Sequence, residues 1–216
     1  MTLMLFALVG CENGLTLPPD DGGGYSGPLK PNLKLKVRPR RNLLPGFDSS
    51  PPPPEPAIYA SQCDDLSDGG VIAGPDCATA EISCGDTVIG HTIGGVERYD
   101  TRFYERNFCT PALTNHDGGN ERVYKLTLPP GDHKAFVYLD TPCADLDIAA
   151  MKITQETCPT EGSIIHQCEM YPKDGTTREK LELVSQKHSV WWIVVEGKPG
   201  QEGPFALHVQ CRKGVI

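Results

Sequence analysis

The chain has 216 residues, nine cysteines and a net charge of −8 at neutral pH. Residues 60–216 carry 23 acidic and 14 basic side chains, and this acidic balance argues against a nucleic-acid partner. After residue 11, no stretch approaches the roughly 18 consecutive apolar residues that a membrane-spanning helix needs. Any attachment to a membrane is therefore expected at the N-terminal end.

Residues 1–11 form an apolar run that closes on Leu8-Val9-Gly10-Cys11. This tetrapeptide resembles the lipobox of bacterial lipoproteins, whose cysteine receives lipid, including palmitate, once the signal peptide is removed. A signal peptide begins with basic residues before about 7–15 apolar ones, but no residue before Cys11 is charged. Either the true start lies upstream, or the resemblance is accidental and Cys11 is a stray thiol. We predict a lipidated Cys11 that anchors the protein to a membrane of the bacterial envelope, facing the periplasm or the exterior.

Residues 12–59 are rich in proline and glycine, and their apolar residues follow neither a helical nor a strand period. We predict a disordered linker at 12–59, a cysteine-containing extension at 60–79 and a folded domain at 80–212. The linker's basic side chains are interpreted as a solvated stretch, with attraction to anionic headgroups or sugars as the alternative. They are Lys30, Lys34, Lys36, Arg38, Arg40 and Arg41.

From about residue 80, short apolar runs alternate with turn formers such as Asp117-Gly118-Gly119-Asn120. This spacing predicts an all-β domain, a sandwich or a barrel. The predicted strands are 86–92, 122–128, 134–139, 147–154, 181–185, 189–196 and 205–211. Only 100–108 has some helical character, which its β-branched and aromatic residues oppose.

The strand at 189–196 is apolar on both faces, which predicts a central strand covered on both sides. Its two tryptophans, Trp191 and Trp192, must point in opposite directions. One of them is a candidate binding surface, a stacking platform for a sugar or for a partner's side chain. The alternative is that both rings are buried.

Eight cysteines lie in the predicted domain and its extension, with no CxxC pair and no histidine at ligand spacing. An even count of this kind predicts disulfides, and therefore an oxidising compartment, rather than zinc. Spacing alone leaves 105 pairings open. We expect neighbours in the sequence or the first and last strands to pair, and the remaining pair follows by elimination. The predicted bonds are Cys63–Cys77, Cys158–Cys168, Cys84–Cys211 and Cys109–Cys143.

The sequence contains no recognisable catalytic motif, so we predict that the protein is not an enzyme and assign no catalytic residue. Its six histidines stand singly and are interpreted as surface side chains. Calcium is the one candidate cofactor, because Asp145 and Asp147 alternate on a strand with Asp140 nearby, and Asp117, Asn120 and Glu121 lie in a glycine-rich turn. The alternative is an acidic edge that its charge keeps soluble.

Several short motifs of the domain occur in a familiar order. They are Cys84-Gly85-Asp86-Thr87-Val88-Ile89-Gly90, Glu121-Arg122-Val123-Tyr124-Lys125-Leu126-Thr127, Ala144-Asp145-Leu146-Asp147-Ile148, Trp191-Trp192-Ile193-Val194-Val195-Glu196-Gly197 and Gly203-Pro204-Phe205-Ala206-Leu207-His208-Val209-Gln210-Cys211. Over about residues 80–212 the chain resembles the bacterial pre-peptidase C-terminal domain. The resemblance implies an antiparallel β-sandwich with jelly-roll-like topology, stapled here by disulfides.

Members of that family usually follow a catalytic domain, which this chain lacks. We therefore expect a non-catalytic, surface-exposed lipoprotein module that interacts with a protein or glycan in the envelope. One alternative is an envelope hydrolase whose site is built from scattered carboxylates. A second alternative, which the family resemblance implies, is a structural or secretion-assisting accessory module of peptidases.

Overall fold

The computed structural model describes residues 54–56, 58, 60, 62–66, 77–107, 109, 116–131, 133–170 and 172–214. The predicted lipobox at Leu8–Cys11 and nearly all of the predicted linker at 12–59 lie outside these residues. Within the described ranges, no helix combines the length and the apolar character that crossing a membrane requires.

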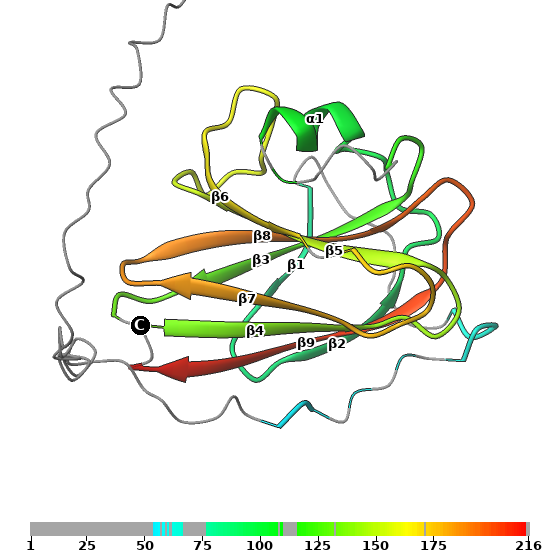
Figure 1. The fold of residues 1–216 in the computed structure, drawn as a ribbon, viewed down its shortest axis with the longest axis horizontal. Coiled ribbons are helices and arrows are strands. Elements are labelled where there is room, and N and C mark those ends of the chain that lie inside the picture. The colour runs from blue at the N-terminus through cyan, green and yellow to red at the C-terminus, as the bar shows by residue number, and fades with distance from the viewer. Residues whose placement is uncertain are drawn as a thin grey trace, which may run out of the picture. The chain divides into compact units, whose positions relative to one another are not determined.

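The described residues fold into two facing β-sheets (Figure 1). The five-stranded sheet has the order β1-β3-β8-β5-β6, and the four-stranded sheet has the order β2-β9-β4-β7. The strands are β1 (Ala78–Ile82), β2 (Thr87–His91), β3 (Glu121–Leu128), β4 (His133–Asp140), β5 (Leu146–Ile153), β6 (Ile165–Met170), β7 (Glu179–Ser185), β8 (Ser189–Gly197) and β9 (Pro204–Lys213). The all-β sandwich prediction is thus confirmed.

Each predicted strand is present with ends that differ by at most two residues, but two edge strands were missed. β1 and β6 are short and lie at opposite edges of the five-stranded sheet. β6 lacks a regular apolar alternation, whereas β1 alternates over only five residues and two of its three apolar residues are small alanines. β1 also pairs parallel to β3, in contrast to the antiparallel pairs around it.

The short stretch with helical character forms α1 (Thr101–Arg106), which lies over the outer face of the five-stranded sheet (Figure 1). Asp100 caps its start by accepting a hydrogen bond from the backbone N–H of Phe103 at 2.7 Å. Phe103 and Tyr104 are buried against the sheet. Packing of these two rings therefore outweighs the low helix propensity of the segment.

The strand β8 is central, as predicted, and every one of its residues is buried. Trp191, Ile193 and Val195 face the core between the two sheets. Trp192 and Val194 face the second apolar cluster, which α1 covers. The chain therefore buries both faces of this strand.

Four disulfides join distant parts of the domain: Cys63–Cys143, Cys77–Cys158, Cys84–Cys211 and Cys109–Cys168. The Cys84–Cys211 prediction is confirmed. The predictions Cys63–Cys77, Cys158–Cys168 and Cys109–Cys143 are wrong, because the sandwich brings together segments 59 to 127 residues apart, rather than neighbours along the chain. The bonds themselves indicate an oxidising, extracytoplasmic compartment.

The fold also extends further toward the N-terminus than the predicted boundary at residue 60. Ile58 is 4% exposed and packs against Phe136 and Tyr138 on the outer face of the four-stranded sheet. Arg178 holds this segment by donating hydrogen bonds to the carbonyl oxygens of Pro56 and Ile58 at 3.1 Å and 2.8 Å.

Candidate functional site

Acidic side chains form a row across the three inner strands of the five-stranded sheet, at one end of these strands. Glu121 on β3 lies opposite Glu196 on β8, and Glu196 lies opposite Asp147 on β5. Their exposed fractions are 1%, 0% and 2%. Glu179, at the start of β7, is also fully buried and accepts a hydrogen bond from the backbone N–H of Ile148 at 2.9 Å. We call Glu121, Glu196, Asp147 and Glu179 the carboxyl row.

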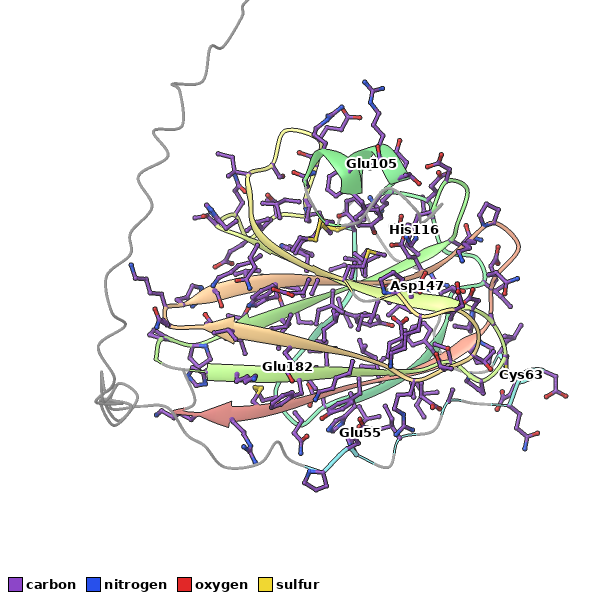
Figure 2. All side chains as sticks on the ribbon, viewed as in Figure 1. Glu55, Cys63, Glu105, His116, Asp147 and Glu182 are labelled. Atoms are coloured by element: carbon purple, nitrogen blue, oxygen red, sulfur yellow. A yellow bond between two sulfur atoms is a disulfide. The ribbon has the colours of Figure 1, made fainter. Side chains whose placement is uncertain are left out.

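Aromatic rings and one histidine surround the middle of the carboxyl row. The Nδ1 atom of His116 lies 3.4 Å from Oε1 of Glu196, and both side chains have no exposed surface. The ring of Tyr104 on α1 packs edge-on against the imidazole of His116, with 5.3 Å between centroids. Figure 2 shows His116 and Asp147 on the same side of the domain as α1. The prediction that all histidines are surface side chains is thus wrong for His116.

Burial determines the protonation of these groups. It raises the pKa of Glu121 to about 8, and burial followed by the charge of Asp147 raises the pKa of Glu179 to about 8. The pKa of Glu196 is raised well above its ordinary value by burial and by Glu121. Burial lowers the pKa of His116 to about 4. Burial therefore favours the uncharged form of both groups in the His116–Glu196 contact.

The structure does not assemble the candidate calcium ligands. Asp140 accepts the backbone N–H of Ala60 at 3.1 Å and pairs with Arg178 at 3.2 Å. Asp145 accepts a backbone N–H from the loop between β6 and β7 at 2.8 Å, while Asp147 is buried in the carboxyl row. In the part of the chain that the structure describes, no three His, Cys, Asp or Glu side chains are grouped closely enough to hold a metal ion.

The two tryptophans do not form a binding surface. Trp191 has no exposed surface and Trp192 is 2% exposed. Since β8 is covered by the second sheet on one face and by the α1 cluster on the other, neither ring can stack on an external ligand. The stacking-platform prediction is wrong, and the buried alternative is correct.

A cavity of about 640 Å³ opens at one end of the sandwich, where β5 and β7 end and β6 and β8 begin. Its polar lining comprises Lys152, Thr154, His166, Gln167, Gln186, Lys187, His188 and Ser189. Ile153, Val184 and Val190 complete the wall. We call this space the basic cavity, because two lysines and two histidines line it and none of its lining residues that the structure describes is a carboxylate.

Lys152 occupies the buried side of the basic cavity. Its Nζ lies 5.5 Å from the centroid of the Trp191 ring and donates a long hydrogen bond, 3.5 Å, to the carbonyl oxygen of Val184. Burial lowers the pKa of Lys152. Nearby, Nε2 of His166 and Oγ1 of Thr154 are 2.6 Å apart. The cavity thus offers cationic, amide and hydroxyl groups for binding.

Sequence reasoning missed the basic cavity because its residues come from three stretches, 152–154, 166–167 and 184–190, that only the sandwich brings together. The strand β6, which supplies His166 and Gln167, was itself not predicted. One signal was present in the sequence: Lys152 interrupts the otherwise apolar end of the strand at 147–154. A charged residue among buried strand positions is unusual, because a buried charge needs an oppositely charged or hydrogen-bonding partner.

A scan against protein-family models gives no match, and a search of curated proteins gives none either. Among solved structures, the chain is similar to the pre-peptidase C-terminal domain of a collagenase from Bacillus anthracis. The TM-score is 0.39 with 13% identity, over 64% of this chain and 99% of that one. It is also similar to PliG from Aeromonas hydrophila, a periplasmic inhibitor of g-type lysozyme, with a TM-score of 0.33 and 9% identity over 62% of this chain and 96% of that one.

Proposed function

We propose that this protein is a non-catalytic binding module of the bacterial envelope, anchored by a lipid on Cys11, with the basic cavity as its ligand site. The observation that carries the proposal is the cavity itself. It is large enough for a small-molecule group, it is open to solvent, and its lining supplies hydrogen-bonding side chains around a partly buried cation. Its partner is a protein or a glycan of the envelope.

The cysteines support the proposed localisation and lipid anchor. All eight cysteines from Cys63 onward pair with one another, so none of the four disulfides of the domain uses Cys11. A cysteine that closes a lipobox-like tetrapeptide is then available for lipid. The four bonds also require export to an oxidising compartment.

The placement of acidic groups supports binding over hydrolysis. A glycosidase needs two carboxyl groups facing one substrate site. The members of the carboxyl row are buried, and the basic cavity is lined by no carboxylate. Among the residues that the structure describes, no acidic side chain hydrogen-bonds the imidazole of the Thr154–His166 pair, as the orienting group of a nucleophile–base pair would.

Two measurements test the proposal. Mass spectrometry of the mature protein from its own membrane fraction is expected to show an acylated Cys11 as the N-terminus and eight oxidised cysteines. NMR titration with a panel of envelope saccharides and peptides is expected to shift resonances of Lys152, His166 and His188, with no new ligand signals over time. An unmodified Cys11 thiol overturns the anchor, and turnover of any panel compound overturns the non-catalytic assignment.

A further inference from the structure

Resting on the function proposed above, we propose that the basic cavity binds a carboxylated glycan, with the ammonium group of Lys152 as the anchor for the sugar carboxylate. The inference goes beyond the general binding role because it assigns both the ligand class and the residue that selects it.

The first step is the unusual position of Lys152 among the lysines of the sandwich. The other partly buried lysines each contact a carboxylate: Lys125 with Glu81 at 3.1 Å, Lys134 with Glu182 at 2.6 Å, Lys180 with Glu182 at 3.3 Å and Lys198 with Asp145 at 3.5 Å. Lys152 forms no ion pair with any described residue. Because a buried cation is costly without a partner, this position is suited to an anion that arrives from outside.

The second step is the charge of the surroundings. The domain is acidic, with 23 acidic and 14 basic side chains over residues 60–216, yet the basic cavity is lined by no carboxylate. Lys187 and His188, both exposed, add positive or titratable groups at its rim. The basic side chains of the cavity wall therefore attract an anion, while the net negative charge of the remaining surface repels it.

The third step distinguishes a charged sugar from a neutral one. Neutral sugars are commonly held by stacking on an exposed aromatic ring, and the basic cavity has no aromatic residue in its lining. The nearest ring is Trp191, which is fully buried and lies beneath the Lys152 ammonium. Recognition must then come from charge and from hydrogen bonds, for which Gln186 offers its side-chain amide. Gln167 and Thr154 contribute their remaining capacity, because their side chains already contact Glu169 at 2.8 Å and His166 at 2.6 Å.

The fourth step distinguishes a glycan from an acidic peptide. An extended peptide binds a sheet edge by continuing its backbone ladder. At the basic cavity, the pairing of β5 with the edge strand β6 shifts register between Lys152 and Ile153, so the ladder is irregular at this point. The polar groups that face the ligand are side chains drawn from separate segments, an arrangement that matches a compact, hydroxyl-rich molecule.

Isothermal titration calorimetry on the full chain, purified in detergent, tests the proposal with four probes of similar size. They are tri-galacturonate, its carboxyl-reduced neutral counterpart, a tri-glutamate peptide and inorganic phosphate. The variants are Lys152→Met and, as a matched control, Lys180→Met, which removes a lysine of β7 outside the cavity lining. Circular dichroism and thermal unfolding verify that both variants fold.

We expect tri-galacturonate to bind in a salt-sensitive manner, Lys152→Met to weaken it by about tenfold or more, and Lys180→Met to leave it within about twofold. Equal binding of the neutral sugar overturns the requirement for a carboxylate. Equal binding of the tri-glutamate peptide or of phosphate overturns the glycan assignment. Equal losses in the two variants overturn Lys152 as the anchor.

These failures are separate from failure of the proposed function. If tri-galacturonate does not bind but the NMR panel still finds a ligand that shifts Lys152 and His166, the carboxylated-glycan proposal is wrong and the binding module stands. If no panel compound shifts the residues of the basic cavity, the proposed site is wrong as well.

Discussion

The carboxyl row predicts that the protein loses stability as the pH rises from mildly acidic to mildly alkaline values. Burial raises the pKa of Glu121 from 4.5 to about 8. Between these pH values the folded chain keeps a proton that the unfolded chain releases, so the free energy of unfolding falls with increasing pH. Glu179, whose pKa is raised from 4.5 to about 8, acts in the same direction. His116 acts in the opposite direction below pH 6.5, because its pKa is lowered from 6.5 to about 4.

The clearest window therefore lies between pH 6.5 and 8, where only the carboxyl effects remain. At about 1.4 kcal/mol for each pH unit, Glu121 alone accounts for a fall of about 2 kcal/mol across this window. The variant Glu121→Gln removes the titration but keeps an Oε1 atom for the backbone N–H groups of Arg98 and Tyr99, which donate to it at 3.0 Å and 2.7 Å. We expect this variant to reduce the fall by about 2 kcal/mol.

Urea unfolding with the disulfides intact, followed through tryptophan fluorescence from pH 5 to 8.5, measures these changes. The control is Glu81→Gln, which alters a largely exposed glutamate paired with Lys125. It is expected to leave the pH dependence unchanged. A free energy of unfolding that rises between pH 6.5 and 8, or a Glu121→Gln variant with the slope of the parent chain, would refute the assignment of Glu121 as a carboxyl that folding keeps protonated.

Three further predictions concern the frame of the domain. Replacing Cys84 and Cys211 by serine is expected to lower the free energy of unfolding by about 4–5 kcal/mol, since the bond closes a loop of 127 residues. Denaturation of the non-reduced protein measures this change, and a loss under about 1 kcal/mol contradicts the prediction. The change Arg178→Ala is expected to release the segment around Ile58, which amide exchange and limited proteolysis would detect as faster exchange and earlier cleavage there. Unchanged protection of this segment would contradict the role of Arg178 in holding it. The change Gly119→Ala is expected to lower the free energy of unfolding by more than about 2 kcal/mol, because a Cβ at this position overlaps the carbonyl oxygen of Gly197. Urea unfolding measures this change, and an unchanged free energy would contradict the close approach of the two backbones.

The strands that were predicted and those that were missed differ in their burial. The central strand β8 could be recognised because Val190 to Val195 are apolar on both faces, as a doubly covered strand must be. The edge strand β6, with the sequence IHQCEM, has no such pattern, because one side of it is open to solvent and its polar residues are tolerated there. The apolar pattern reports burial, so it identified the central strands and the edge strands β2 and β7 but not the more polar edge strand β6.

Disulfide pairing and the candidate site depend on contacts between distant segments, which sequence spacing does not determine. Cys84–Cys211 could be predicted because the first and last motifs of the domain were expected to be neighbours, and β2 does pair with β9. Cys77 instead pairs with Cys158 in the loop between β5 and β6, although β1 and β6 lie at opposite edges of the five-stranded sheet. The same folding collects the basic cavity from three stretches of the chain, so its residues carry no common motif.

The carboxyl row and the basic cavity lie at opposite ends of the same two central strands, and this separation bears on ligand binding. β5 runs from Asp147 in the row to Lys152 in the cavity, and β8 runs from the cavity wall at Ser189 to Glu196 in the row. At about 3.4 Å per residue, Asp147 and Lys152 are about 17 Å apart along the strand. At an effective dielectric constant of about 20, two unit charges at this separation interact by only about 1 kcal/mol. Burial also raises the pKa of Glu121 and Glu179 to about 8 and that of Asp147 only to about 6, so Asp147 carries most of the negative charge among these three groups at pH 7. A domain that is acidic in composition can therefore present a cationic site to an anionic ligand.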